Sequence, residues 1–159
     1  MDNIVEQPRT EIVDLASEPL LACESLLMAS LVATEDGYAV ELGRRPVDEE
    51  GVHPAYKPVR LDLASLPRVR RLAEDAAILV PGLVLAWGDM MLLAEDGDID
   101  ATVSCAKGEL PWFSLVQGGG EGLVTMPARE ADALARLLRD TERQLADRGL
   151  AALDRSLAH

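Results

Sequence analysis

The sequence predicts an α+β fold in which antiparallel sheet packs against two amphipathic helices in an internally duplicated unit. Three observations predict this class. Two Glu-Asp-Gly segments lie between apolar stretches, as in β-hairpins. Two further segments carry apolar residues at helical spacing. Finally, both kinds of feature recur at one offset along the chain of 159 residues, which is long enough for one domain with a hydrophobic core.

The first hairpin is expected at Asp36-Gly37, where it pairs Leu31 and Ala33 with Val40 and Leu42 on one face. A second hairpin is expected at Asp96-Gly97. Its register places seven small or apolar residues on one face of the sheet, which predicts that this face is buried: Met90, Leu92, Ala94, Ile99, Ala101, Val103 and Cys105.

Further strands are expected at Val59–Leu63, Leu83–Trp87, Trp112–Gln117 and Leu123–Met126. The segment 44–56 has the polar composition of a loop, and Gly118–Gly120 forms a loop tip. Near the N-terminus the pattern is ambiguous, and Thr10–Ser17 is compatible with a short helix.

The first helix is expected to begin at Ser65, with Pro67 in its first turn, and to end by Val80, because Pro81-Gly82 cannot continue it. The second helix is expected to open at Thr125 and Pro127. It carries an apolar stripe and ends at a glycine in the C-cap position; the stripe comprises Ala131, Leu134, Leu138 and Leu145, and the glycine is Gly149.

An internal repeat follows from two matches at an offset of 60 residues. Glu35-Asp36-Gly37 recurs as Glu95-Asp96-Gly97, and the segment 63–67 recurs as 123–127. These matches predict an N-terminal extension over 1–24, a single domain over 25–149 built from repeats 25–80 and 85–149, and a C-terminal tail over 150–159. The alternative is that hairpin turns and helix starts simply reuse the same residue types.

The net charge of −13 is unevenly distributed along the chain. Residues 1–55 carry −9 and residues 81–126 carry −6, whereas residues 56–80 carry +2 and residues 127–159 carry 0. The negative net charge of the whole chain opposes general binding of nucleic acid. The two less acidic segments are the ones predicted to be helical, so the few positive groups are concentrated on helices.

The segments 90–102 and 122–129 resemble a domain of the bacterial sliding clamp, the beta subunit of the replicative DNA polymerase. The similarity lies in the Glu-Asp-Gly hairpin and in the helix start Val124-Thr125-Met126-Pro127-Ala128. It covers roughly residues 25–145 and implies a fold of duplicated strand–helix–strand units, with sheets outside and helices lining a hole for duplex DNA. The chain holds about one such domain, so a ring would need several copies or a partner. No strand pair follows the second helix, and the hairpin at 25–43 is expected to fill that place by permutation.

The resemblance implies that arginines on the two helices contact DNA phosphates without reading sequence. The candidate DNA-binding residues are Arg68, Arg70, Arg71, Arg129, Arg136, Arg139 and Arg143. A second interpretation is that both helices have ordinary solvated faces of mixed sign, since Asp132 and Asp140 lie four residues from Arg136 and would neutralise it.

No catalytic, metal or cofactor motif is present in the sequence. Asp96, Asp98 and Asp100 alternate as in a calcium loop, but Ala101 and Lys107 occupy the positions that require Gly and Glu. The segment Gly118–Gly122 lacks the Lys-Ser/Thr pair of a phosphate-binding loop, and the two histidines are isolated. We therefore expect no metal, no cofactor and no enzymatic function.

Two functions are compatible with these features. The first is a non-catalytic, self-associating, sliding-clamp-like protein that associates with double-stranded DNA or with the replication and repair machinery. The second is an acidic module, such as an inhibitor, immunity protein or export chaperone, that docks a basic protein. No secretory signal or membrane-spanning stretch is recognisable, and the two cysteines are expected to remain reduced, so the expected location is the cytoplasm.

Overall fold

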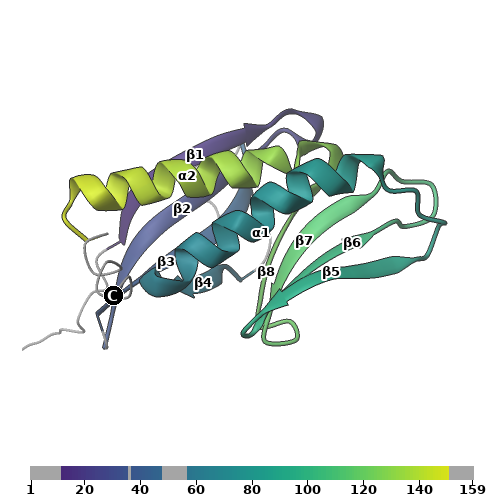
Figure 1. The fold of residues 1–159 in the computed structure, drawn as a ribbon. Helices are drawn as coiled ribbons and strands as arrows, with labels where there is room; N and C mark the ends of the chain where they lie inside the picture. The colour runs from purple at the N-terminus through teal and green to yellow at the C-terminus, as the bar shows by residue number, and fades with distance from the viewer. Residues whose placement is uncertain (1–11, 36, 48–56, 151–159) are drawn as a thin grey trace, which may run out of the picture.

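The computed structural model describes residues 12–35, 37–47 and 57–150, which form two halves with the same order of elements (Figure 1). In the first half, β1 (Ile12–Leu20), β2 (Ser25–Thr34), β3 (Gly37–Pro46) and β4 (Val59–Asp62) precede α1 (Leu66–Leu79). In the second half, β5 (Met90–Asp96), β6 (Ile99–Ser104), β7 (Trp112–Gln117) and β8 (Gly122–Pro127) precede α2 (Asp132–Asp147). Each half forms a four-stranded sheet in sequence order, β1-β2-β3-β4 and β5-β6-β7-β8, with every pair antiparallel. This confirms the predicted α+β class.

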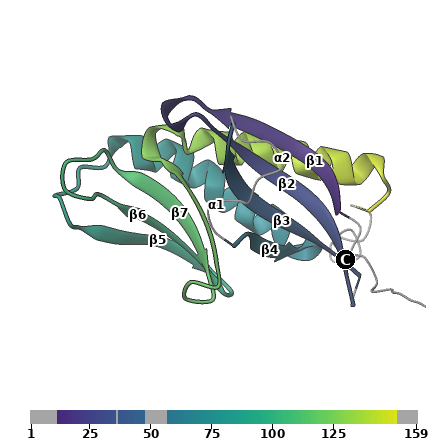
Figure 2. The same cartoon turned by 180° about the vertical axis from the view of Figure 1, so that it is seen from behind.

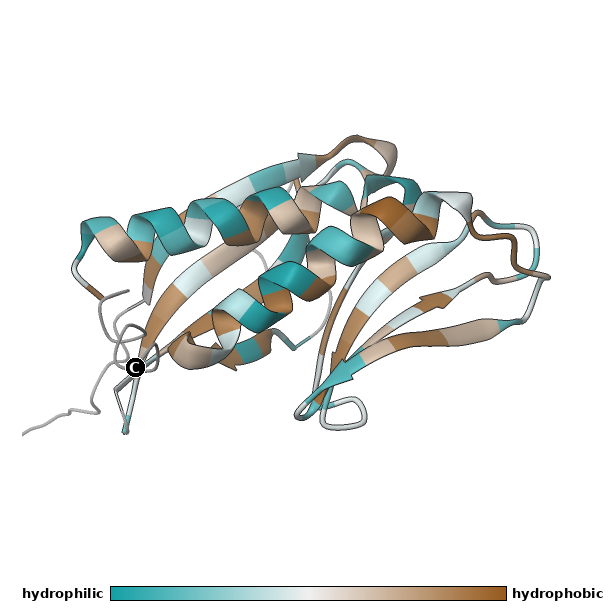
Figure 3. Ribbon diagram, viewed as in Figure 1, coloured by the Kyte–Doolittle hydropathy of each residue, from teal (hydrophilic) through white to brown (hydrophobic). Residues whose placement is uncertain are grey.

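Both helices lie on one side of the molecule and the two sheets on the other, as the two opposite views show (Figures 1 and 2). Each helix crosses over: α2, which follows the second sheet, packs on β1 and β2, while α1 packs on α2 and on β5. One continuous core joins the inner faces of both sheets to both helices, and its fully buried members include Leu27, Val69, Phe113 and Leu138. Apolar and polar residues alternate along the strands, as this one-sided burial requires (Figure 3).

The two sheets meet where β4 approaches β8. The N–H of Leu123 donates to the carbonyl of Lys57 at 2.9 Å. The side-chain amide of Gln117 completes the junction, because its oxygen accepts from the N–H of Arg60 at 2.8 Å and its nitrogen donates to the carbonyl of Arg60 at 2.7 Å. Gly122 permits the close approach: a Cβ at this position would lie 2.6 Å from the carbonyl oxygen of Pro58. The outer edge of β4 is thereby satisfied by a side chain in place of another strand.

Several sequence predictions are confirmed and several are wrong. The first helix has the expected bounds, and Gly149 adopts φ +80° just beyond the end of α2. The second helix begins at Asp132, seven residues after Thr125, because Thr125 is held in β8, where it accepts a hydrogen bond from Ser114 at 2.9 Å. The expected strand Leu83–Trp87 is absent from the described residues, since this segment carries no ladder hydrogen bonds.

The N-terminal segment also differs from expectation. Residues 12–20, interpreted as the start of an extension and partly as a short helix, form β1 along β2. The expected boundary between extension and domain at residues 24 and 25 therefore lies inside the first sheet. An edge strand is formed here because pairing with β2 satisfies the backbone and buries Leu15 and Leu20. The parts of the chain at 1–11, 36, 48–56 and 151–159, including much of the expected polar loop and the tail, lie outside the described residues.

The repeat is present in the order of elements, but the matched tripeptides are not equivalent within it. Glu35-Asp36-Gly37 lies at the turn between β2 and β3, whereas Glu95-Asp96-Gly97 lies at the turn between β5 and β6, one hairpin earlier in its half. The tripeptide also occupies a different position in each turn. In the first turn its glycine, Gly37, pairs with Thr34, whereas in the second turn its aspartate, Asp96, pairs with Ile99. The helix starts at Leu66 and Asp132 are 66 residues apart, so the offset of 60 does not relate equivalent positions.

We expect Gln117→Ala to lower the free energy of unfolding by about 1 kcal/mol, because the backbone N–H and carbonyl of Arg60 lose their partner at the sheet junction. Thermal or urea unfolding measures the change. Gln144→Ala is the matched control, since Gln144 makes no side-chain hydrogen bond within the described residues, and should change stability by less than about 0.5 kcal/mol. Equal effects of the two substitutions would contradict the proposed junction.

Candidate functional site

Six of the seven candidate DNA-binding arginines lie on the paired helices. Arg68, Arg70 and Arg71 occupy the first half of α1, and Arg136, Arg139 and Arg143 occupy α2. Arg70 and Arg139 face the groove between the helices, as their shared partner Glu74 shows. The other four side chains are exposed, and two of them reach the sheets: Arg68 contacts Asp96 of β5, and Arg136 contacts Glu18 of β1. The structure therefore places these six residues on the paired helices, but their side chains point in different directions.

Five of these six arginines are engaged in ion pairs. Arg68 contacts Asp96 at the end of β5 at 3.1 Å, and Arg136 contacts Glu18 of β1 at 3.1 Å as well as Asp132. Arg143 contacts Asp140 at 2.9 Å. Arg71 makes no ion pair within the part of the chain that the structure describes. With their own acidic residues included, the two helices carry six arginines and six carboxylates, so the helical surface is close to neutral.

The groove between the helices holds a four-residue ion-pair network. Arg70 donates to Glu142 of α2 at 2.8 Å and to Glu74 one turn along α1 at 3.2 Å, and Arg139 of α2 donates to Glu74 at 3.0 Å. The hydrogen bond with Glu142 is the main cause that raises the pKa of Arg70 above its ordinary value, and Glu74 adds to it. The hydrogen bond with Glu18 is the main cause that raises the pKa of Arg136. These contacts tie α1 to α2, and α2 to β1.

Arg129 is placed differently from the prediction. It lies in the short 3-10 turn Ala128–Glu130 before α2, near the turn between β1 and β2 and the end of α1. It makes no ion pair with any described residue. The carboxylate of its neighbour Glu130 accepts from the backbone N–H groups of Leu21 at 2.9 Å and Ala22 at 3.1 Å. Arg129 is therefore separated from the helical surface formed by the other six arginines.

The predicted buried face of the second hairpin is correct for β6 and wrong for β5. Ile99, Ala101 and Val103 are buried, whereas Met90 is 72% and Leu92 is 52% exposed. A bulge explains the difference: the register shifts between Leu92 and Ala94, so Met90 and Leu92 share the outer face with Ser104 and Thr102. The outer face of this edge strand is thus apolar at Met90 and Leu92.

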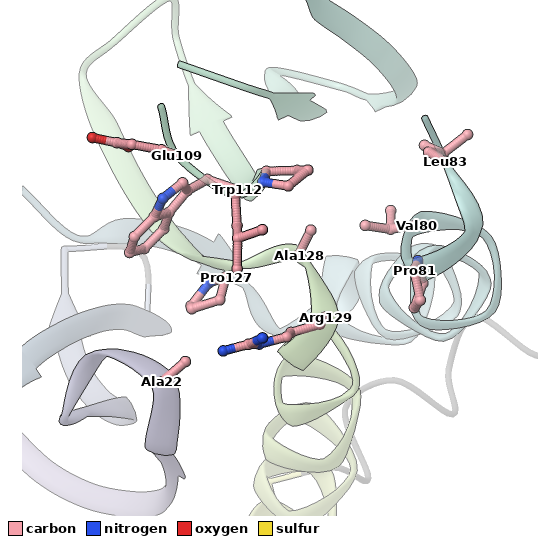
Figure 4. Close-up of a pocket in the computed structure, with 11 residues that line it drawn as sticks. Ala22, Val80, Pro81, Leu83, Glu109, Trp112, Pro127, Ala128 and Arg129 are labelled. Atoms are coloured by element: carbon pink, nitrogen blue, oxygen red, sulfur yellow. The ribbon is translucent and has the colours of Figure 1, made fainter. Parts of the chain in front are cut away.

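A pocket that the sequence did not reveal lies beside Arg129 (Figure 4). It has a volume of about 490 Å³ and is formed by the turn at 21–23, the turn at 80–82, the segment 109–112 and the turn at 128–130. Its walls are largely apolar, with Val80, Pro81, Leu83, Trp112 and Pro127 among them. No spacing rule could have found this pocket, because its walls come from four separate parts of the chain.

The described residues hold no cluster of three or more His, Cys, Asp or Glu side chains that could bind a metal ion. Their two thiols, Cys23 and Cys105, are free. None of the described helices has the length and apolar character needed to cross a membrane.

We expect Arg70→Met to destabilise the protein by about 1–2 kcal/mol, because it leaves the partly buried Glu142 carboxylate without its partner. Arg143→Met is the control, since its ion pair is exposed and should contribute less than about 0.5 kcal/mol.

A raised arginine pKa adds stability that is complete below the pKa of the unfolded chain and is lost only as the pH rises through the higher folded value. The difference between Arg70→Met and the unmodified protein should therefore stay constant from about pH 7 to 9. A difference that falls over this range would contradict the assignment.

A comparison of the chain with protein-family models finds no match. Among curated proteins, the chain is similar to the bifunctional adenosylcobalamin biosynthesis protein CobP of Pseudomonas aeruginosa, with 30% identity over 116 residues. The matched part makes up 69% of this chain and spans 66% of that protein, which is slightly less than two thirds of its length.

This similarity corrects one prediction from the sequence. The absence of a catalytic motif led to the expectation that the chain is not an enzyme, and a match to a biosynthetic protein contradicts it. The expectation failed because it rested only on motifs that are contiguous in the sequence, whereas residues that form a pocket can come from distant segments.

Proposed function

We propose that this chain is the subunit of a self-associating, sliding-clamp-like assembly whose helical surface faces double-stranded DNA. The observation that carries the proposal is the arrangement of the two halves. Each half contributes a four-stranded sheet and one helix, and the two helices lie side by side on the same side of the molecule. In this proposal the hairpin at 25–43 takes the place of the strand pair that the clamp family's order puts after the second helix.

The outer edge of β5 supports self-association. Natural proteins protect edge strands with charges, prolines or short length, but Met90, Met91 and Leu92 are consecutive, exposed and apolar. Leu79 at the end of α1 lies in the same groove as Leu93 and Ala94, and it is 51% exposed. The β1 edge is protected by comparison, with a bulge after Asp14 and with Pro19, which cannot donate a hydrogen bond. A second copy of β5, added antiparallel, would cover the apolar edge.

Antiparallel pairing of two β5 strands is also favoured by charge. Glu95 and Asp96 lie at one end of the strand, so antiparallel pairing about a two-fold axis keeps these two acidic ends apart, whereas parallel pairing would place them side by side. If that axis is perpendicular to the sheet, the helices of both copies remain on the same side. A continuous sheet with a continuous helical surface would result, which is the geometry needed to face DNA.

The helical surface supports loose contact with DNA in preference to tight binding. The described residues carry 20 acidic and 13 basic side chains, a net charge of −7, whereas α1 and α2 together are neutral. DNA is therefore repelled least from this surface. Arg71, and Arg143 with its 66% exposed side chain, are the arginines best placed to reach phosphates.

Self-association predicts a particle heavier than one chain of 17.1 kDa when gel filtration is followed by light scattering. Leu92→Lys should shift this particle to the monomer, because it places a charge on the apolar edge of β5. Leu21→Lys is the control, since Leu21 is 79% exposed at a different end of the fold, and it should leave the assembly unchanged. A strict monomer in the unmodified protein would refute the assembly.

The DNA contact predicts weak, salt-sensitive retention of duplex DNA at low ionic strength. Replacing Arg68, Arg71, Arg136 and Arg143 by Glu should abolish this retention, whereas Lys107→Glu, on an exposed loop away from the helices, should not. Fluorescence anisotropy with a labelled duplex at several salt concentrations measures both. If the unmodified protein does not bind DNA at low salt, the DNA part of the proposal fails, whatever the result for self-association.

A second candidate is a docking module for a basic protein. It is favoured by the ion pairs that already occupy five of the six helix arginines and by exposed acidic residues without ion-pair partners among the described residues, including Asp62, Glu95 and Glu121. Such a surface would accelerate association with a positively charged partner. A pull-down that recovers basic proteins but neither DNA nor replication factors would support this candidate over the clamp-like one. For either function we propose a cytoplasmic location, which the two free thiols support.

A further inference from the structure

We infer that the pocket beside Arg129 binds a small apolar carboxylate, such as an aryl or alkyl carboxylic acid. Its volume of about 490 Å³ lies in the range of pockets that enclose small organic ligands. The inference concerns the pocket between the turn at 21–23, the end of α1 and the start of α2, and it does not depend on the β5 edge or on the helical surface.

The apolar walls of the pocket would bind the hydrocarbon part of the ligand. Trp112 and Pro127 lie next to each other as the paired ends of β7 and β8. Val80, Pro81 and Leu83 lie on the other side of the pocket, at the end of α1 (Figure 4). An aromatic or branched group between these walls would gain contact with an indole ring, which is among the most favourable apolar surfaces that a protein offers.

Arg129 would bind the carboxylate. Figure 4 shows its guanidinium between Pro127 and Ala22, at the side of the pocket, while the Glu109 carboxylate extends away from the other lining side chains. The guanidinium of Arg129 makes no ion pair within the described residues, and the neighbouring Glu130 carboxylate accepts from the backbone N–H groups of Leu21 and Ala22. An arginine beside an apolar wall can hold a carboxylate through two parallel hydrogen bonds, which favours a planar acid over an amine or an alcohol.

The walls are held in place before any ligand binds. The guanidinium of Arg44 lies over the indole of Trp112, at 5.3 Å from the ring centroid, and also donates to Ser25 at 3.2 Å. Ala22 is fixed by its hydrogen bond to Glu130, and the N–H of Ala128 donates to the carbonyl of Pro111 at 2.9 Å. A preformed pocket loses little conformational entropy on binding, so a small ligand can bind measurably.

The test uses the full chain with Trp87→Phe, which leaves Trp112 as the sole tryptophan and hence as a fluorescent reporter of the pocket. The probe is 3-phenylpropionate, compared with 3-phenylpropylamine, which has the same ring and the opposite charge. We expect 3-phenylpropionate to change the Trp112 emission saturably, with a dissociation constant at or below about 1 mM, and the amine to have no such effect.

Three further substitutions in this background locate the site. Arg129→Gln should weaken binding of 3-phenylpropionate at least about tenfold through loss of the charged hydrogen bonds. Ala22→Leu should abolish binding because its larger side chain fills the pocket beside the Arg129 guanidinium. Arg148→Gln removes an exposed arginine beyond the end of α2 and should leave binding unchanged. Circular dichroism verifies that each variant is folded. Absence of saturation, equal binding of the amine, or unchanged binding by folded Arg129→Gln would each overturn the inference.

Discussion

The structure depends on the contact between α1 and α2. Each helix is connected to one sheet by sequence but packs largely beyond it, with α2 on β1 and β2, and α1 on α2 and β5. Leu134, Leu137 and Leu138 are fully buried at this contact and over the first sheet. Burial of each such side chain contributes roughly 1.5–3 kcal/mol relative to the exposed state. The two sheets share one core because the helix pair bridges them, since the direct junction of β4 with β8 is small.

The ion pairs follow from the same contact. Once α1 and α2 lie side by side, Arg70 meets Glu142 and Arg139 meets Glu74, although these partners are 72 and 65 residues apart. Arg70 and Arg139 thus hold the two helices together. Because the helix arginines are paired with carboxylates, the helical surface is close to neutral. For the same reason we propose only a loose contact with DNA. The same contact also explains why Arg129, which precedes α2, is available for a different role.

The helix pair also determines which edges of the sheets remain open. It orients both sheets so that β4 and β8 meet, which leaves β1 and β5 at the outer edges (Figures 1 and 2). The bulge in β5 then turns Met90 and Leu92 outward. At the opposite side of the same junction, the ends of the helices and of β7 and β8 enclose the apolar pocket. The open edge and the pocket are thus separate consequences of one packing arrangement.

The local elements follow from patterns within short segments of the sequence. The spacing of apolar residues and the residue types at turns were sufficient to predict α1, both hairpins, β4, β7 and β8, because these signals act over a few neighbouring residues. Other features depend on how distant segments pack. Thr125 is a strand residue because β7 lies beside it, and residues 12–20 form a strand because β2 is available. Four helix arginines, Arg68, Arg70, Arg136 and Arg139, pair with carboxylates of other elements. The pocket beside Arg129 also depends on contacts between distant segments, since four separate parts of the chain form its walls. These features depend on contacts between residues far apart in the chain, and no periodicity or spacing within a segment encodes such contacts.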